Sequence, residues 1–514
     1  QEYLTLDAKH VEILDETGRD RTGEFNIQDK DGVLYAFART VDTMIPATGE
    51  TVPGDPQPDD LKAYSEKSDK DYDPLKDPSI DQSLLGHTYQ VVMPMTVTKV
   101  KDGHTVENTA TQVTNDKRDK TNTVTNPLKE INPTKDVTVQ VGGDSIDGKS
   151  VYLNHTFLYR LDSSILPADR AYQTVTDWGG TDQLNTEYDQ YLGNWAVYAS
   201  RDLYRDGQML AAKGEKIAGS GFDSSMFGGN LFTVDADDNG KVTADATQAY
   251  LDLVSADNEH EAGWVLYLQC KRIAVADEVP NTWTETINGQ PRESNKVVTK
   301  TPDMTPSIHL EKVDTPTLKQ EGQEQADRDD SKQALKMDAD SIGITFIITN
   351  TSKTDPATGD GAWFKASDLN LDDSTIVGDA HVDMDSLTYP ADWDTLVLKP
   401  GESVSVTGTL KGVKEGETHT DRAIVTGTPL VECAPSNGDP FNDKTDGGED
   451  TDPEYSTGDV TEIDGKQLCA DTQTASNTDD WNGYRAKPLA STGTAVLGLA
   501  GGRSEEHTSE LQSL

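Results

Sequence analysis

Alternation of apolar and polar residues with a period of two dominates this chain and restricts what it can fold into. It is clearest in HTFLYRL (155–161), ITFIITN (344–350) and SVSVTGTL (403–410). A strand places successive side chains on opposite faces, so each run buries one face and leaves the other in water. Turn-forming clusters such as DADDNGK and PATGDG separate the runs, and helical periodicity is scarce. We therefore expect an all-β fold of tandem immunoglobulin-like β-sandwich domains.

Length and proline-bearing joints divide the chain into modules. At 514 residues it is too long for one hydrophobic core, since single cores rarely grow past about 250 to 300 residues. NPLKEINPTK (126–135) and TKTPDMTPSIHLEK (299–312) are typical of joints between domains. The stretch after the last sandwich is rich in Asp, Gly, Thr and Asn, which predicts a polar, partly disordered stalk. The expected order is three β-domains at 1–129, 130–303 and 304–435, a stalk at 436–488, an anchoring signal with a truncated apolar segment at 489–502, and an artefactual end at 503–514.

The charge balance limits the partners. Lys and Arg number 45 against 91 Asp and Glu, which gives a net charge of −46. A surface this acidic repels nucleic acids and anionic membranes, so neither is expected as a partner. No organic cofactor is expected, and calcium remains possible because divalent cations suit carboxylate-rich surfaces. We expect an elongated monomer.

Three cysteines are too few for a disulfide-framed fold or a zinc ribbon. Cys270 lies inside the apolar run WVLYLQCKRIA, which predicts a buried position on a strand. Cys433 and Cys469 flank a polar loop. They can pair outside the cell or stay free, and the sequence leaves both readings open.

Two motifs resemble ligand sites but stand between strands. GDSIDGKS (143–150) fits the phosphate-loop pattern, yet an alternating strand follows where a helix is needed, so a hairpin turn is the better interpretation. DADDNG offers Asp235, Asp237 and Asn239 as calcium ligands, but Ala246 occupies the twelfth position, where a bidentate Glu is needed. A hairpin tip is again favoured. No catalytic constellation is present, so we expect no enzyme.

A run of elements from residue 133 onward resembles the second domain of the C-terminal region of the streptococcal antigen I/II adhesins. The elements are PTKDVTV, IDGKSVYLNHTFLYRL, YDQYLGNW, LYLQCKRIAVADEVPNTWTETIN and VVTKTP, in the order that the family has. The resemblance implies an immunoglobulin-like sandwich of the DE-variant type. It also implies an intramolecular isopeptide bond between a first-strand Lys and a last-strand Asn.

Carried over by residue, Lys135 matches the nucleophilic lysine and Asp177 matches an acidic position that we take as the polarising acid. Burial would favour the neutral amine, and a neutral acid would polarise the carbonyl under attack. Glu285 stands at the expected acceptor position, with Asn281 and Asn288 as alternatives on either side. The other interpretation is an ion pair between Lys135 and Glu285 at a sandwich edge.

The neighbouring modules carry parts of the same pattern. TVENTATQ resembles the end of the first domain of that C-terminal region, so residues 1–129 would be the second half of this domain, and Asn108 matches an acceptor whose lysine would lie upstream of Gln1. The third module resembles the repeat-type immunoglobulin-like domains of Gram-positive surface proteins. Lys312 and Asp421 hold its first-strand and last-strand positions, either as an amide or as a solvated ion pair.

LASTG at 489–493 resembles the variant sortase signal of actinobacterial wall proteins. It comprises Leu489, Ala490, Ser491, Thr492 and Gly493. It follows a polar stretch and precedes the apolar TAVLGLAGG, as a membrane-held precursor requires. The resemblance implies sortase and peptidoglycan as partners and an extracellular, wall-anchored location. RSEEHTSELQSL (503–514) resembles a translated sequencing adapter and is left out of the fold.

Taken together, these features predict the stalk portion of a wall-anchored adhesin. The resemblance implies host surface proteins or salivary and mucosal glycoproteins as partners. A pilus backbone subunit and the stalk of a wall-anchored exported enzyme are the alternatives.

Overall fold

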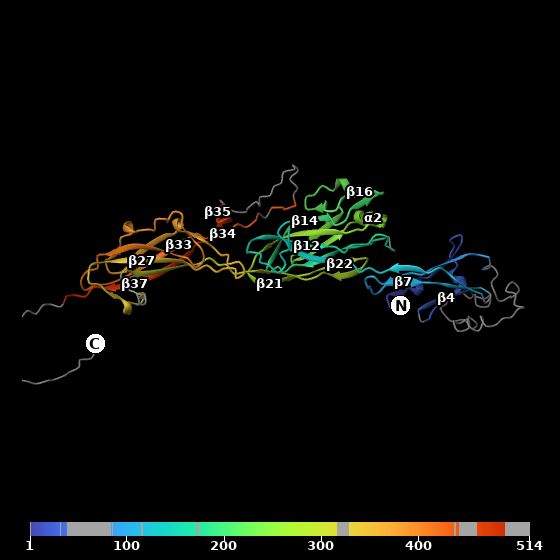
Figure 1. Cartoon of the computed structure of the whole chain (residues 1–514), viewed down its shortest axis with the longest axis horizontal. Coiled ribbons are helices and arrows are strands. Elements are labelled where there is room, and N and C mark those ends of the chain that lie inside the picture. Colours follow the sequence, from blue (N-terminus) through green and yellow to red (C-terminus); the bar gives the residue numbers. More distant parts are fainter. Residues whose placement is uncertain are drawn as a thin grey trace, which may run out of the picture.

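The chain forms an elongated row of three β-rich bodies, in sequence order along the long axis (Figure 1). This computed structural model describes residues 2–30, 32–38, 84, 86–114, 117–170, 174–315, 328–435, 438–441 and 460–488. Strands account for nearly all the regular structure there, together with helix α2 (Gln248–Ala256) and short 3-10 turns. The prediction of tandem β-sandwich domains is confirmed. Within these ranges, no helix has the length and apolar character needed to cross a membrane.

The N-terminal body consists of antiparallel two-stranded ladders. They pair β1 with β6, β2 with β5, β3 with β4, β7 with β10, and β8 with β9. The bounds are β1 (Leu4–Leu6), β2 (Glu12–Asp15), β3 (Phe25–Lys30), β4 (Val33–Ala38), β5 (Tyr89–Val92), β6 (Met95–Val97), β7 (Thr105–Asn108), β8 (Thr111–Thr114), β9 (Lys117–Lys120) and β10 (Val124–Pro127).

The middle domain packs two five-stranded sheets face to face. One has the order β11 (Thr134–Thr138), β12 (Thr156–Asp162), β20 (Trp264–Arg272), β14 (Asp189–Ala199) and β17 (Lys216–Gly219). The other has the order β18 (Phe232–Ala236), β19 (Lys241–Ala246), β13 (Trp178–Gln183), β22 (Trp283–Ile287) and β23 (Gln290–Glu293). Two ribbons complete it, β15 (Leu203–Arg205) with β16 (Gln208–Ala211), and β21 (Ala276–Asn281) with β24 (Val297–Thr301).

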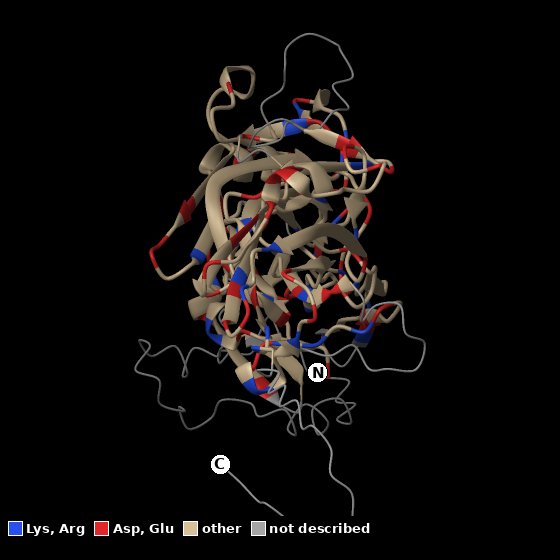
Figure 2. Ribbon diagram, turned by 90° about the vertical axis from the view of Figure 1, so that its left-hand side faces the viewer, with Lys and Arg blue, Asp and Glu red and all other residues tan. Residues whose placement is uncertain are grey.

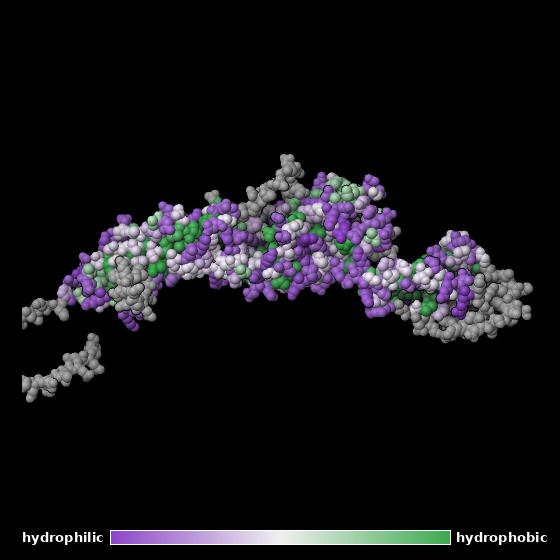
Figure 3. Space-filling model, in the orientation of Figure 1, coloured by the Kyte–Doolittle hydropathy of each residue, from purple (hydrophilic) through white to green (hydrophobic). Residues whose placement is uncertain are grey.

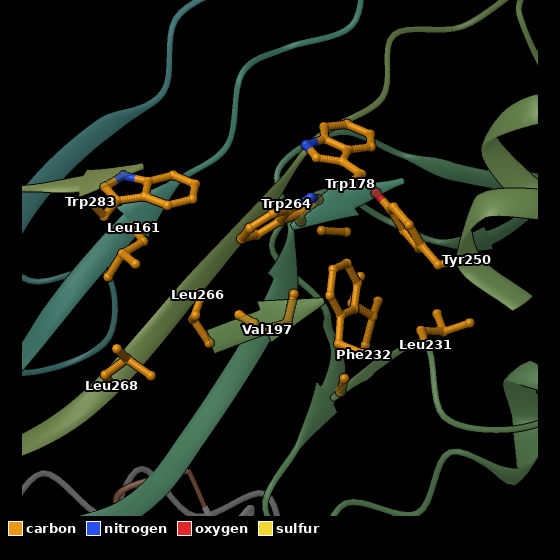
Figure 4. Close-up of a cluster of buried hydrophobic side chains, with 14 of the residues drawn as sticks. Leu161, Trp178, Val197, Leu231, Phe232, Tyr250, Trp264, Leu266, Leu268 and Trp283 are labelled. Carbon is orange, nitrogen blue, oxygen red and sulfur yellow. The ribbon is translucent and has the colours of Figure 1, made fainter. Parts of the chain in front are cut away.

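Large aromatic side chains fill the space between these sheets (Figure 4). Trp264 from the first sheet lies between Trp178 and Trp283 from the second, with ring centroids 6.2 and 5.8 Å away. Tyr250 of α2 closes one end against Trp178, at 5.9 Å. Tilted rings at these separations are the arrangement that aromatic quadrupoles favour. The inward positions of the alternating runs therefore form one continuous core.

The third domain is a second sandwich, with two four-stranded sheets. One has the order β25 (Ile308–Asp314), β27 (Ser341–Asn350), β32 (Ser403–Lys411) and β30 (His381–Val382). The other has the order β26 (Leu335–Lys336), β37 (Ala475–Tyr484), β33 (Thr418–Gly427) and β29 (Asn370–Val377). A small sheet, β34 (Leu430–Glu432), β36 (Lys466–Ala470) and β35 (Thr461–Ile463), and the ribbon β28 (Phe364–Lys365) with β31 (Val397–Leu398) flank it.

The boundary expected at residue 435 is wrong, because the third domain includes strands from the predicted stalk. β37 pairs with β33 over ten residues, from Thr418 opposite Tyr484 to Gly427 opposite Ala475. Its Trp481 is completely buried in the core of the sandwich. The polar composition around this strand hid it, because only its inward positions are apolar.

A segment of the third domain reaches back to the middle domain. After β34, residues 438–441, here called the arm, lie along the outer face of the sheet that contains β14 (Figure 1). Phe441 is 2% exposed and packs among apolar side chains of that sheet, which are Leu158, Ala196, Val265 and Tyr267. Gln269 donates a hydrogen bond to the Gly438 carbonyl at 3.1 Å. Polar bonds join the two domains directly as well, from Ser150 to Asp355 at 2.9 Å and from Tyr152 to Asp360 at 3.0 Å.

The surface is strongly polar. Hydrophilic residues predominate over the described surface seen in Figure 3, with small scattered apolar patches. Asp and Glu lie all around the circumference, on strands and loops alike, with fewer Lys and Arg between them (Figure 2). The net negative charge is therefore spread over the molecule instead of being gathered at one site.

Candidate functional site

The middle domain buries a lysine on its first strand. Lys135 lies on the edge strand β11, and its side chain is fully buried. Its ammonium pairs with the carboxylate of Asp182 on β13 in the opposite sheet, and lies 4.6 Å from the centre of the Tyr159 ring. Burial lowers the pKa of Lys135, and the charge of Asp182 opposes this only in part. The site therefore shifts the lysine toward its neutral, nucleophilic form.

A side-chain clasp fixes the strand that carries this lysine. Asn295 accepts a hydrogen bond from the backbone N–H of Lys135 at 2.8 Å, and its amide donates to the Lys135 carbonyl at 2.9 Å. The indole N–H of Trp283 donates to the Thr134 carbonyl at 3.0 Å. The two Asn295 bonds satisfy both backbone groups of Lys135, and the Trp283 bond satisfies the carbonyl of the residue before it.

An asparagine with no hydrogen-bond partner lies next to this clasp. Asn281 is 6% exposed, and neither its amide oxygen nor its nitrogen has a hydrogen-bond partner among the described residues. Trp283, two residues later on the same inward face, lies opposite Asp182 in the β13–β22 ladder. Asn281 itself lies opposite Val297, two residues beyond the clasping Asn295. A buried amide without partners is costly, and this one stands two residues before Trp283, the residue opposite Asp182.

The expected acid, Asp177, is wrong. Asp182, five residues further along, is the carboxylate that meets Lys135. Asp177 is half-buried just before β13, where it accepts a hydrogen bond from the Gly289 N–H at 3.1 Å. At about 3.3 Å per strand residue, the two carboxyl groups lie roughly 16 Å apart along the chain.

Glu285, the expected acceptor, has other partners. Its Oε1 accepts hydrogen bonds from the Ser164 N–H at 2.9 Å and the Trp178 indole at 2.8 Å, and its Oε2 accepts from the Ser164 hydroxyl at 2.5 Å. Burial raises the pKa of Glu285, and these bonds counteract it only in part. The expected pairing of Glu285 with Lys135, as an amide or as an ion pair, is therefore wrong.

Asn288, the other alternative acceptor, is an exposed turn residue. It has a φ of 47° and precedes Gly289 at the tip of the β22–β23 hairpin. Asn-Gly is the pair that favours such two-residue turns, because both positions need positive φ. Its side chain accepts from the Thr176 N–H at 2.8 Å. Of the three acceptors considered from the sequence, only Asn281 is buried without a hydrogen-bond partner among the described residues.

The third domain repeats the arrangement with different residues. Lys312 on β25 is fully buried, and its ammonium pairs with Asp373 on β29 and with Asp421 on β33, the latter at 2.6 Å. Both carboxylates belong to the sheet opposite β25. The pair is buried and not solvated, and Asp421 lies on β33 and not on the last strand, β37. Lys312 and Asp421 therefore contact each other, as predicted. The structure corrects the degree of burial of the pair and the strand on which Asp421 lies.

A clasp also holds this lysine strand. The side chain of Asp479 on β37 accepts from the backbone N–H of Lys312 at 2.5 Å, and Asn477 accepts from the Leu310 N–H at 3.0 Å. These side-chain bonds connect β25 to the last strand, which belongs to the other sheet. Both sandwiches therefore hold the backbone of the lysine with a side chain from late in the domain, Asn295 between β23 and β24 in one and Asp479 on β37 in the other.

The two carboxylates around Lys312 differ in character. Burial raises the pKa of Asp373 to about 6, and the nearby charge of Asp421 adds to this, while Lys312 opposes it. Burial also acts to raise the pKa of Asp421, but contacts with His419 and Lys312 outweigh it and the net shift is downward. Asp373 is therefore the group that holds a proton more readily, and Asp421 is the more persistent anion.

His419 completes this centre. It lies two residues before Asp421 on the inward face of β33, is 1% exposed, and places Nε2 3.2 Å from Oδ2 of Asp421. Sequence reasoning missed His419, Asp182 and Asp373. The alternating pattern marks all three positions as inward-facing, and a charged residue at an inward position is the signal that could have identified them.

The remaining predicted sites have simpler structures. Asn108 is exposed at the end of β7, opposite Val124. The DADDNG motif forms the β18–β19 hairpin tip, where Asp237 accepts from the backbone N–H groups of Asn239 and Lys241, each at 2.9 Å. Asp235 lies on β18, and no cluster of three or more metal-binding side chains occurs in the described residues.

The phosphate-loop motif is a turn and not a helix start, because Ser145 bridges back to Thr138. Cys433 and Cys469 form a disulfide that joins the end of β34 to β36, and Cys270 is buried on β20 with a free thiol, as its sequence context predicts. The sortase signal, Leu489–Gly493, lies outside the described residues.

Two family models match consecutive parts of this chain. The cell surface antigen I/II C2 terminal domain matches residues 1–128, and the cell surface antigen C-terminus matches residues 132–302. Aggregation substance of Enterococcus faecalis is 35% identical over 225 residues, which is 43% of this chain but only 16% of that protein. The chain thus spans a small part of that relative's length.

Solved structures of C-terminal domains are similar as well. Those of the Streptococcus agalactiae antigen I/II polypeptide BspA (19% identity, TM-score 0.40) and the Streptococcus pyogenes antigen I/II-family protein AspA (22% identity, TM-score 0.41) each cover 58% of this chain and 82% of their own. With matches to successive domains over more than half of its length, the chain belongs to the cell surface antigen I/II family and carries the C-terminal domains of that family.

Proposed function

We propose that this chain is the wall-proximal stalk of a surface adhesin, stiffened by two intramolecular amides, Lys135 to Asn281 and Lys312 to Asp421. One observation carries the proposal. Each sandwich buries a first-strand lysine against a carboxylate of the opposite sheet, and each also buries an acceptor for an amide, Asn281 in the middle domain and Asp421 in the third. A stalk under shear gains from such bonds because they connect the two sheets covalently.

In the middle domain, the neutral amine of Lys135 attacks the side-chain carbonyl carbon of Asn281. The new C–N bond replaces the bond to the amide nitrogen, which leaves as ammonia after it takes a proton. Asp182 accepts a proton from the lysine and passes it to the leaving nitrogen. Its Oδ1 has no hydrogen-bond partner among the described residues, so this oxygen is free to contact the acceptor. The fold supplies the proximity that makes the reaction intramolecular.

In the third domain, the acceptor is a carboxylate, and the leaving group is water. Lys312 attacks the side-chain carbon of Asp421, and Asp373 relays a proton as Asp182 does. The raised pKa of Asp373, about 6, suits this role near neutral pH. Its Oδ1 likewise has no hydrogen-bond partner among the described residues.

Intact mass of the whole chain tests both bonds. After reduction of the disulfide, the chain should be lighter than its sequence mass by one ammonia and one water. Compared with its own sequence mass, Lys135→Arg should lack only the water, and Lys312→Arg should lack only the ammonia. The reason is that arginine keeps the charge but is a poor nucleophile. A chain at its full sequence mass would refute both bonds.

We also propose that a sortase joins the chain to peptidoglycan. A sortase cysteine would attack the carbonyl of Thr492, release Gly493, and pass the acyl group to a wall amine. The polar acidic surface around the stalk is compatible with an extracellular location. Incubation with a wall-protein sortase and a glycine peptide should give a product that ends at Thr492 plus that peptide. Thr492→Ala should give none.

Membership of this family makes the chain part of a cell-surface adhesin. We propose host surface glycoproteins, including salivary and mucosal ones, as its partners. To test this, the binding of the whole chain is measured on an immobilised mucin-type glycoprotein and on the same glycoprotein without its glycans. Equal binding to both surfaces would contradict recognition of the glycan.

A further inference from the structure

A second carboxylate and an imidazole distinguish the third-domain centre from the middle-domain centre. The middle-domain centre consists of the Lys135 ammonium, one carboxylate and a buried carboxamide. Around Lys312, there are two carboxylates and the imidazole of His419. The acceptors also differ, since one centre offers Asn281 and the other Asp421.

The difference in acceptor changes how many protons the leaving group needs. An amide nitrogen leaves as ammonia after it gains one proton. A carboxylate oxygen leaves as water only after it gains two. One proton relay, Asp182, is therefore sufficient in the middle domain, while the third domain needs a second donor directed at the departing oxygen.

His419 is placed for that task. Nε2 lies 3.2 Å from Oδ2 of Asp421, the same oxygen that lies 2.6 Å from Lys312. The ring is 1% exposed, and its Nδ1 has no hydrogen-bond partner among the described residues. On its other sides it faces Trp481, with ring centroids 6.3 Å apart, and the backbone of Gly378. No purely structural bond thus occupies either ring nitrogen.

We propose that His419 is a catalytic residue of the third domain, the acid that protonates the departing Oδ2 of Asp421 while Lys312 forms the amide. This inference rests on the Lys312–Asp421 bond proposed above. The charged groups around the ring are Asp421 on its own strand, Lys312 on β25, Asp373 on β29 and, at the backbone of Lys312, Asp479 on β37.

The atoms and protons balance. The Lys312 ammonium gives one proton to Asp373, and the freed Nζ lone pair bonds to the side-chain carbon of Asp421. Oδ2 takes one proton from Asp373 and one from the protonated His419, and the C–Oδ2 bond breaks to release water. Nζ then gives its second proton to the imidazole. Asp373 and His419 end as they began, and the net change is one amide and one water.

The test follows water loss over time in the whole chain, made by cell-free translation and sampled for peptide mass after digestion. His419→Gln keeps a side-chain N–H donor but cannot supply a proton from a charged ring. We expect it to slow amide formation in the third domain by about a hundredfold, which is typical for loss of a general acid. Ammonia loss at Lys135 in the same molecules should keep its rate and serves as the internal clock.

A second variant separates chemistry from folding. Combining His419→Gln with Asp421→Asn makes ammonia the leaving group, so this double variant should close at the rate of Asp421→Asn alone. Unchanged closure in His419→Gln would overturn the proposal, and so would a double variant that stays open while Asp421→Asn closes. If the unmodified chain loses no water in this domain, the amide itself is absent, and this result differs from each of the others.

Discussion

At the scale of single residues, the two buried lysines share one physical problem. A buried ammonium is tolerated only with a partner, and removing one member of a buried ion pair costs about 3–5 kcal/mol. An amide removes the problem instead of balancing it, because the product carries no charge at either atom. With the amide formed, Asp373, whose pKa burial raises to about 6, no longer has the opposing charge of Lys312 beside it.

Asp182→Asn should prevent amide formation in the middle domain. The variant leaves Lys135 buried without a proton acceptor, so the chain should keep its ammonia and lose roughly 3–5 kcal/mol of stability. Asp177→Asn is the matched control, since Asp177 lies on the same stretch of chain but is remote from the lysine. Intact mass and chemical unfolding measure the two effects. Ammonia loss in Asp182→Asn would remove Asp182 from the mechanism.

Glu285→Gln should change how stability depends on pH. Because the pKa of Glu285 is raised above its ordinary value of 4.5, its contribution is complete below that value and is lost as the pH rises through the raised pKa. A glutamine can reproduce the protonated form, with its oxygen facing Trp178 and its NH2 facing the Ser164 hydroxyl. The variant should therefore be at least as stable as the unmodified chain at neutral pH and less dependent on pH. Thermal unfolding from pH 4 to 8 measures this, and loss of ammonia should be unaffected.

The residues of the two buried centres differ in how well the sequence pattern predicts them. Lys135 and Lys312 could be found because each stands on an alternating strand at the start of its domain. Asp177 was a false prediction because it was carried over from the family resemblance, whereas Asp182 is the acidic residue at an inward position of β13. Asp182 needs the register of β13 against β22, which is a long-range pairing.

At the scale of elements, β37 shows that composition and strand formation are separate properties. The strand ASNTDDWNGY is mostly polar, yet it is paired on both sides and contributes Trp481 to the core. A half-buried strand needs apolar residues at inward positions alone, and a few small or polar ones are enough when a large ring fills the space. Alternation therefore predicted the β-sandwich fold correctly, but the polar composition of this region made the third domain appear to end too early.

Trp481→Ala should destabilise the third domain by about 3–5 kcal/mol, the usual cost of truncating a large buried aromatic side chain. Tyr389→Ala is the control, because Tyr389 is 42% exposed. Hydrogen exchange resolved by domain measures the change, and the middle domain should keep its protection. Equal protection in both variants would mean that β37 is not needed for the fold of the third domain.

At the scale of the whole molecule, the arm gives the middle and third domains a second attachment. One linker between domains usually permits relative motion. Here the chain crosses at 302–307 and then returns to place Phe441 in an apolar site of the other domain. The polar bonds nearby, such as Ser150 to Asp355, are partly exposed and contribute less than the buried ring.

Phe441→Ser should therefore increase the flexibility of this joint. Spin labels at Met209 and Tyr389, exposed by 58% and 42% in the two domains, report the distribution of distances between them. We expect a narrow distribution in the unmodified chain and a clearly broader one in Phe441→Ser. Phe441→Leu keeps an apolar side chain and should remain narrow. A serine variant as narrow as the parent would mean that the arm does not hold the joint.

The disulfide between Cys433 and Cys469 limits how far the third domain can extend when the molecule is pulled from its two ends. With the Lys312–Asp421 amide formed, residues 313–420 cannot extend, and the disulfide, which spans 36 positions, withholds residues 434–468. Only 422–432 and 470–484 remain free to lengthen. The third domain could then stretch by on the order of 90 Å, against about 600 Å for the same domain without cross-links. The amide protects the loops before β33 and the disulfide protects those after it, so a reducing medium would lengthen the tether without breaking the amide.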